Sequence, residues 1–318
     1  MSHFSEVKRR TGDDDIKKTI GIIIGICVMM ICLCACGQEE TKPMEAELDL
    51  DQIVESIEMK DGFIPQIGIV LGSGLHPLAD EIEVVQTIPY EEIPGFPYST
   101  IEGHEGQYIL GYLEGVPVIL MDGRIHYYEG DAMEEVVTPD RIMSKLGAET
   151  IILTHAVGSM REDFKPGELA CITDHIASFV PNPLIGQNDE ELGDRFVGMA
   201  DAYDQSLRTI AHIAAEELGI ELKDSVYMQV TGPTFETPAE AEAYASLGAD
   251  TVGMSTAVET IALRHMGVRV LGISCITNYC PNVVSESTSH EEVQEAADKA
   301  ADNMVSLVRR TVGMIAKT

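Results

Sequence analysis

The chain has 318 residues, a hydrophobic content of 45% and a formal net charge of −32 at pH 7. This length corresponds to one large domain or two ordinary ones, and the apolar content is sufficient for a globular core. The strong negative charge argues against nucleic acid or an anionic membrane surface as a partner. It does not exclude a locally positive pocket that binds a small anionic substrate.

The amino-terminal segment has the pattern of an export signal. Five basic residues within residues 1–19 are followed by the uncharged apolar run Ile20–Ala35, IGIIIGICVMMICLCA, as in a signal peptide. Its sixteen residues are fewer than the roughly 20 that a membrane-spanning helix needs. The run ends in Leu33-Cys34-Ala35-Cys36, which resembles a bacterial lipobox, where the last cysteine is lipidated and becomes the new amino terminus.

We therefore expect a lipoprotein signal peptide at 1–35, a lipidated Cys36 and a flexible acidic tether at 36–52. The protein would then be lipid-anchored at the extracytoplasmic side of the cell membrane. Two alternatives stay open. An uncleaved anchor gives the same topology, because positive charge stays inside, whereas a protein in which this segment is not used would be cytoplasmic.

The seven cysteines indicate neither a disulfide framework nor a metal site. Three of them are spread widely over the body of the chain, at positions 171, 275 and 280, which does not suit a disulfide framework. Cys32, Cys34 and Cys36 alternate within the apolar run, without the additional His or Cys ligands of a zinc site. Cys275 and Cys280 suggest either a redox switch or, more simply, buried thiols.

The body, residues 53–318, alternates strand-like and helix-like segments. Short runs rich in Val and Ile predict buried strands at 67–72, 116–121, 150–156, 225–232 and 268–277. Helical patterns lie between or after them at 133–146, 201–219, 238–247, 257–266 and 290–316. This alternation predicts a single α/β domain with a central mixed sheet flanked by helices.

Five short motifs follow predicted strands: LGSGL at 71–75, DGRIHYYEG at 122–130, GPTFET at 232–237, GMST at 253–256 and ITN at 276–278. Each also has an ordinary structural interpretation as a turn, a solvated loop or a helix start. Their residue types suit ligands nonetheless: Gly and Ser for an anion, Arg with His for a phosphate, and Glu with Asn for a heterocycle edge. Because open α/β sheets bind ligands beyond the carboxyl ends of their strands, the five together predict one binding site.

These residues resemble the trimeric, low-molecular-mass purine nucleoside phosphorylases. The resemblance extends over roughly residues 50–318 and includes, besides the five motifs, IPGFPYSTIEGHEG (93–106), NDEELGDRF (188–196) and SHEEV (289–293). It implies phosphorolysis of purine ribonucleosides or deoxyribonucleosides to a free base and a pentose 1-phosphate. No cofactor or metal is implied, phosphate being a co-substrate, and the implied partners are the nucleoside, phosphate and two further copies in a homotrimer.

The resemblance also implies a role for each matching residue. Phosphate would be held by Ser73, His104, Arg124, His126, Ser255 and the N–H of Ala156. The ribose would contact Tyr128, Met254 and His290. The purine would contact Phe235, Glu236 and Asn278, and Phe196 would reach the neighbouring subunit's site. Asn278, Glu236 and His126 are the expected catalytic residues, because an amide can donate to the purine as negative charge develops on it. Asn278 favours inosine and guanosine over adenosine.

The chain departs from the family pattern at a few positions. Where the family reads Thr-Asn-Ala-Ala-Gly-Gly, this chain has THAVGS at 154–159, so His155 and Val157 replace smaller residues. His76 follows LGSGL in place of a glycine, and a side chain there disfavours positive φ. These departures leave two alternatives: a non-catalytic nucleoside-binding lipoprotein, or a phosphorylase that prefers adenosine or methylthioadenosine.

Overall fold

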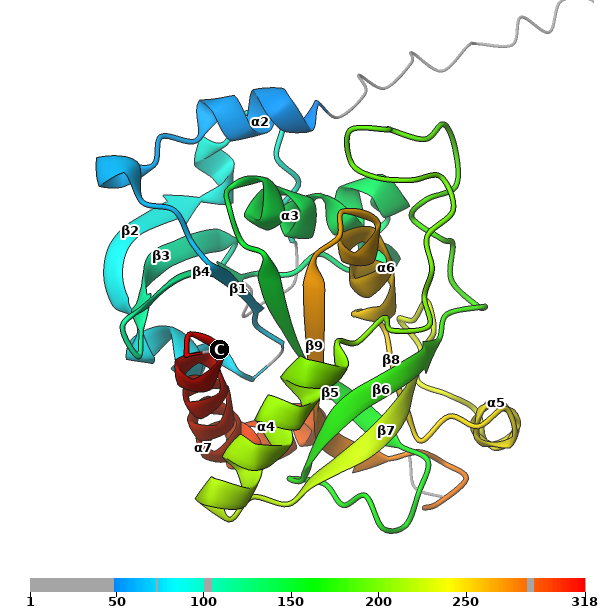
Figure 1. The fold of residues 1–318 in the computed structure, drawn as a ribbon. Helices are drawn as coiled ribbons and strands as arrows, with labels where there is room; N and C mark the ends of the chain where they lie inside the picture. Colours follow the sequence, from blue (N-terminus) through cyan, green and yellow to red (C-terminus); the bar gives the residue numbers. More distant parts are fainter. Residues whose placement is uncertain (1–48, 73, 100–104, 285–288, 318) are drawn as a thin grey trace, which may run out of the picture. The chain divides into compact units, whose positions relative to one another are not determined.

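The computed structural model describes residues 49–72, 74–99, 105–284 and 289–317. Over these residues the chain forms a nine-stranded mixed sheet in the order β2-β3-β4-β1-β5-β8-β7-β6-β9, and β9 returns to pair with β5 (Figure 1). The strands β5, β8, β7, β6 and β9 therefore close on themselves. The predicted α/β fold with a mixed central sheet is confirmed.

The nine strands are β1 Ile67–Val70, β2 Glu83–Pro89, β3 Gln107–Leu113, β4 Val116–Asp122, β5 Thr150–Ser159, β6 Leu169–Ile176, β7 Leu222–Gln229, β8 Thr251–Gly253 and β9 Arg269–Tyr279. The helices are α2 Leu50–Ser56, α3 Met133–Lys145, α4 Gln205–Leu218, α5 Pro238–Ser246, α6 Ala257–His265 and α7 His290–Ile315.

The central strands β1, β5 and β9 are apolar because helices cover both faces of the sheet. β1 is buried at all four positions and runs parallel to β4 and β5, while β5 runs parallel to β9. Such strands have near-continuous runs of Val, Ile and Leu. By contrast, the edge strand β2 is largely exposed or half-buried, so its sequence gives a weaker strand signal.

Two hydrophobic clusters hold the helices to the two faces. Residues of α2, α3 and α6 belong to one cluster, and residues of α4 and α7 belong to the other. Figure 1 shows α3 beside α6, and α4 beside α7. The loops that follow the strands carry the predicted motifs, so the sheet places them.

The structure extends the predicted elements in several places. Strands β2, β3, β6 and β8 have no counterpart among the predicted strands. Helix α2 begins at Leu50, within the segment expected to be a tether, because Asp49 caps it by accepting hydrogen bonds from two backbone N–H groups. At α7, Ser289 and Glu292 form a capping box. The described residues, from Asp49 onward, belong to one compact unit. Within the described ranges no helix is long and apolar enough to cross a membrane, and Cys36 lies outside them.

Candidate active site

A cavity of about 400 Å³ opens where β4, β5, β7 and β9 end. It collects most of the residues that the motifs single out: Arg124, His126, Tyr128, Ala156, Phe235, Glu236, Met254, Ser255 and Asn278. They come from five segments that are far apart in sequence, at 124–128, 156, 235–236, 254–255 and 278. Four of the five motifs therefore converge on one cavity, whereas no described residue of LGSGL (71–75) lines it.

The remaining predicted residues are placed elsewhere or not described. Ser73 and His104 lie outside the described residues. His290 is the first residue of α7, but its side chain lies outside the description. Phe196 is 91% exposed and does not line the cavity; it lines a separate surface groove of about 910 Å³ together with residues 175–178 and Met199.

The buried end of the cavity is organised around Arg124. Its guanidinium donates two hydrogen bonds of 2.8 Å to the Glu259 carboxylate and one of 2.8 Å to the Thr154 carbonyl. The side chains of Arg124 and Glu259 are only 1% and 2% exposed. Burial alone would lower the pKa of Arg124, but the facing carboxylate raises it, so the arginine stays charged and fixed in orientation.

His126 is fixed by Tyr128 and Glu129, which lie two and three positions further along the chain. Its ring stacks on Tyr128, with 4.8 Å between the ring centroids, and its backbone N–H donates to Glu129 over 2.8 Å. Burial lowers the pKa of His126, although the hydrogen bond with Glu129 opposes the shift. Burial also raises the pKa of Tyr128 to about 12, with help from Glu129. His126 is thus a mainly neutral ring beside the Arg124 guanidinium at neutral pH.

A chain of hydrogen bonds connects Ser255 to the core. The Ser255 hydroxyl lies 3.1 Å from that of Thr256, which lies 2.9 Å from Nδ1 of His155. Nε2 of His155 lies 2.7 Å from the Ser274 hydroxyl. Burial, followed by the charge of Arg124, holds the pKa of His155 well below its ordinary value. The ring is therefore neutral, with one nitrogen donating and the other accepting.

The backbone of Thr256 shows that this arrangement is under strain. Thr256 has φ +69°, a left-handed conformation that is unfavourable for a β-branched residue. Thr256 directly precedes α6, where a threonine hydroxyl can cap the helix. Its side chain makes no capping bond there. Its hydroxyl contacts Ser255 and His155 instead.

Asn278 is positioned by an irregularity in the β5–β9 pairing. The register shifts between Val157 and Gly158, and Gly158 then pairs with Asn278. A Cβ atom on Gly158 would lie 3.1 Å from Nδ2 of Asn278 and 2.9 Å from Sγ of Cys280. A glycine is thus needed for Asn278 to occupy this place. The Asn278 amide accepts from the Thr277 hydroxyl over 3.0 Å.

The opposite end of the cavity is more open. Phe235 is 42% exposed, and Glu236 is half-buried beside it. Burial, with a smaller contribution from Glu240, raises the pKa of Glu236. Thr237 caps α5 and Pro238 is the first helical residue, so this motif both starts a helix and lines the cavity.

The departures from the family pattern are accommodated in the structure. His76 has no positive φ, so its side chain is compatible with the turn, and its Nδ1 lies 3.2 Å from the Asp122 carboxylate. Val157 is buried in the cavity wall. His155 is also in this wall and is hydrogen-bonded at both ring nitrogens. Cys275 and Cys280 are buried and form no disulfide.

Sequence reasoning missed Glu259 and Tyr227. Glu259 looks like an ordinary acidic residue in the first turn of a helix, and only the fold brings it to Arg124. The Tyr227 hydroxyl donates to the carbonyl of Ser255 and accepts from its N–H, which fixes the backbone of a predicted phosphate ligand. No local pattern in the sequence could reveal either contact.

Chemically, the cavity has two different ends. One presents a charged guanidinium, a hydroxyl and a histidine, which suit an anion. The other presents an aromatic ring, a carboxyl and an amide, which suit a planar heterocycle with donors and acceptors on its edge. Tyr128 and Met254 lie in the same cavity. A lining of this kind suits an anion and a heterocyclic compound held together.

A family model described as the phosphorylase superfamily matches residues 66–313, which is most of the chain. The fold and the site thus define a member of that superfamily. Purine nucleoside phosphorylase 1 of Bacillus subtilis (strain 168) is 49% identical over 248 residues, covering 78% of this chain and 92% of the relative. That of Geobacillus stearothermophilus is 46% identical over 268 residues, covering 84% and 98%.

Solved structures give the same result. Schistosoma mansoni purine nucleoside phosphorylase in complex with inosine has a TM-score of 0.79 and 36% sequence identity, covering 83% of this chain and 95% of that one. The chain belongs to the purine nucleoside phosphorylase family.

Proposed function

We propose that this protein catalyses the phosphorolysis of purine ribonucleosides and deoxyribonucleosides, preferably inosine and guanosine, to the free base and pentose 1-phosphate. The observation that carries the proposal is the single cavity that Arg124, His126 and Ser255 line together with Glu236 and Asn278. When phosphate and a purine nucleoside are bound there together, the phosphate contacts the sugar of the nucleoside.

The phosphate end supplies charge and fixed donors. The Arg124 guanidinium, oriented by Glu259, attracts the phosphate dianion, and the Ser255 hydroxyl, the backbone N–H of Ala156 and the His126 ring supply hydrogen bonds. Cleavage of the glycosidic bond leaves positive charge on the sugar. The phosphate stabilises this charge and then captures the sugar carbon. Because the donors are already oriented, little reorganisation is needed during the reaction.

The purine end supports the leaving group. Electrons of the breaking glycosidic bond move into the purine ring, and the Asn278 amide donates to the ring atoms on which this charge develops. Such a hydrogen bond strengthens in the transition state and so accelerates cleavage. Glu236, as a carboxylate, accepts from the ring N–H of a 6-oxopurine, while Phe235 covers the ring face. The side chains and backbone of the protein supply every group named in these steps. The proposed reaction uses phosphate as co-substrate without a cofactor.

The proposal is tested by following hypoxanthine release from inosine as phosphate is varied. We expect the rate to rise from near zero to saturation as phosphate is added, and adenosine to react more slowly than inosine or guanosine. Nucleoside binding that is indifferent to phosphate, without base release from the folded protein, would instead indicate a nucleoside-binding protein.

We also propose that the protein acts as a homotrimer in which Phe196 reaches the neighbouring subunit's site. An aromatic side chain that is 91% exposed, beside a groove containing Ile185 at 79% exposure, is an apolar surface of the kind that subunit contacts cover. Sedimentation analysis should give three times the chain mass. Phe196→Ala should raise the KM for inosine without changing the fold.

The location follows from the sequence pattern around Cys36. We propose that the protein is lipidated there and held at the extracytoplasmic side of the membrane by the lipid alone. Labelling with a radioactive lipid precursor should mark the wild type and not Cys36→Ser. Equal labelling of both, or labelling of neither, contradicts the anchor without bearing on the reaction.

A further inference from the structure

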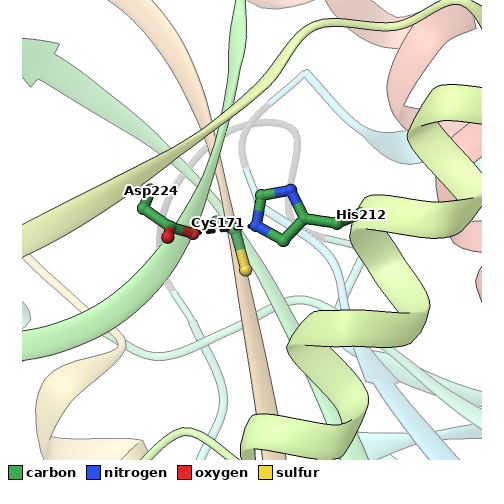
Figure 2. A group of neighbouring side chains, drawn as sticks. All are labelled: Cys171, His212 and Asp224. Atoms are coloured by element: carbon green, nitrogen blue, oxygen red, sulfur yellow. Dashed lines mark hydrogen bonds and ion pairs between the residues drawn. The ribbon is translucent and has the colours of Figure 1, made fainter.

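A second cluster of reactive side chains lies away from the cavity, between helix α4 and strands β6 and β7. Cys171 and Asp224 are paired in the register of the parallel strands β6 and β7, so their side chains lie side by side on one face of the sheet. His212 of α4 approaches the same face. Figure 2 shows the three side chains converging from the three elements.

The ligand atoms of these residues are close together. The Cys171 sulfur, a His212 ring nitrogen and an Asp224 carboxylate oxygen all lie within 4.8 Å of one another. Nε2 of His212 already lies 2.8 Å from Oδ1 of Asp224. None of the three residues lines the 400 Å³ cavity, so the proposed phosphorolysis does not account for the cluster.

The chemical identity of the set selects the metal. Thiolate, imidazole and carboxylate together are ligands of zinc, whereas magnesium and calcium take oxygen ligands. Zinc bonds of about 2.0–2.3 Å in a tetrahedron place the ligand atoms roughly 3.3–3.7 Å apart. The distances from the Cys171 sulfur, at most 4.8 Å, therefore need to close by up to about 1.3 Å, and the 2.8 Å between His212 and Asp224 needs to open by about 0.5 Å.

The two exposed ligands, His212 and Asp224, can make this adjustment. The side chains of His212 and Asp224 are 38% and 59% exposed and can rotate toward the sulfur, while Cys171 is fully buried and fixed by β6. The exposed side leaves room for a water molecule as fourth ligand.

We propose that Cys171, His212 and Asp224 form a binding site for one zinc ion. Binding replaces the His212–Asp224 hydrogen bond by two metal bonds, and the Cys171 thiol transfers its proton to solvent as the sulfur–zinc bond forms. The ion ties α4 to β6 and β7, and β7 leads directly into the segment that carries Phe235 and Glu236. We expect the ion to act structurally, by holding α4 against the two strands.

The cluster also has a simpler interpretation without a metal, and the test must distinguish the two interpretations. An exposed His–Asp pair contributes little by itself, and burial, followed by the charge of Asp224, raises the pKa of the Cys171 thiol to about 12. Without a metal the cysteine would be an unreactive core residue beside an ordinary surface ion pair.

The experiment is a cobalt titration of the full chain, freed of metal with a chelator, in which Cys27, Cys32, Cys34 and Cys36 are all replaced by alanine. Co²⁺ reports a bound thiolate through an intense near-ultraviolet charge-transfer absorption and a tetrahedral site through its visible bands. We expect one equivalent of Co²⁺ to produce both, and one equivalent of Zn²⁺ to abolish both. Zn²⁺ should also raise the thermal unfolding midpoint.

Matched variants decide the assignment. Cys171→Ala and His212→Ala should each lose the charge-transfer absorption and the thermal shift. Cys275→Ala, which removes an equally buried thiol, and His76→Ala, which removes a histidine from another carboxylate pair, should keep both. His212 is half-exposed, so its replacement leaves the fold intact even if Cys171→Ala does not.

Absence of a thiolate absorption at saturating Co²⁺, or its survival in His212→Ala, overturns the proposal. These readouts do not depend on catalysis. A chain that binds zinc but releases no base from inosine would refute the proposed reaction and leave the zinc site standing.

Discussion

The two ends of the cavity are built differently. Arg124 and His155 are each 1% exposed and Thr256 is fully buried, so the phosphate end is continuous with the core. Phe235, at the purine end, is 42% exposed and lies on the segment between β7 and α5. We infer that changes at the phosphate end alter stability as well as function, whereas changes at the purine end alter function with little effect on the fold.

The largest effect is expected at the buried ion pair. Glu259→Ala leaves the Arg124 guanidinium buried and uncompensated, which should lower the free energy of unfolding by about 3–5 kcal/mol. Urea denaturation measures this loss. Glu217→Ala is the control, because its bond to Arg310 is exposed and should contribute only about 0–1 kcal/mol. Equal losses in the two variants would contradict the inferred role of the buried pair.

Asn278 lies near the end of the core strand β9, and we propose that it donates to the purine. Asn278→Ala should lower kcat for inosine by about 10²–10³-fold, as removal of a donor to developing charge does. Unfolding should change little. Asn282→Ala is a matched control, since this nearby asparagine donates to the Met160 carbonyl and does not line the cavity. A large loss of kcat in both variants would mean that the segment, rather than the donor, is responsible.

The buried carboxyl group of Asp140 makes the stability of the protein depend on pH. Both carboxylate oxygens are buried without a hydrogen-bond partner in the part of the chain that the structure describes. Burial, followed by the charge of Glu259, raises the pKa of Asp140 well above its ordinary value. The folded state then holds this proton more tightly than the unfolded state, so stability falls as pH rises above the unfolded pKa of about 3.9.

Asp140→Asn removes that ionisation. The difference between wild type and variant should grow in the variant's favour between pH 5 and pH 8, by about 1–3 kcal/mol. Urea unfolding at the two pH values measures it. A wild type that gains stability relative to Asp140→Asn over this range would show that the carboxylate is paired and ionised.

Substitutions of His155 test whether the chain of hydrogen bonds from His155 to Ser255 contributes to phosphate binding. His155→Leu leaves the Thr256 and Ser274 hydroxyls without this partner and should raise the KM for phosphate by about tenfold. His155→Asn can still donate and accept, and should restore most of the affinity. Steady-state kinetics with phosphate varied at saturating inosine distinguish the two. If both variants behave alike, the ring matters only for packing.

An effect of similar size, confined to nucleoside binding, is expected at Glu236. Glu236→Gln should raise the KM for inosine by about tenfold, the magnitude of one hydrogen bond to a charged group, and leave the KM for phosphate and the unfolding midpoint unchanged. Because burial raises the pKa of Glu236, the wild-type KM for inosine should rise as pH falls through that pKa. A pH profile retained in Glu236→Gln would assign the titration to another group.

The same contrast explains how much the sequence could predict. Arg124, Ser255 and Asn278 could be placed at one site because each follows a strand, and strand ends meet at one edge of a sheet. Two further contacts could not be predicted. His155 and Thr256 are 101 positions apart, and Arg124 and Glu259 are 135 apart; both depend on how α6 packs.

The elements follow the same logic. Buried strands such as β1 and β9 have apolar runs that identify them, whereas exposed β2 does not. Helix α2 was missed because Asp49 and Asp51 look like part of an acidic tether, although Asp49 caps the helix. The pairing of Cys171 with Asp224 depends on the register between β6 and β7, which no pattern within either strand determines.

The central claim is that one cavity brings phosphate to the sugar of a bound purine nucleoside. Phosphorus NMR of the full chain with inosine and phosphate tests it most directly. The account predicts one ribose 1-phosphate for each hypoxanthine released, and neither product from Asn278→Ala on the same time scale. Release of hypoxanthine with free ribose, or no release at saturating phosphate, would contradict it.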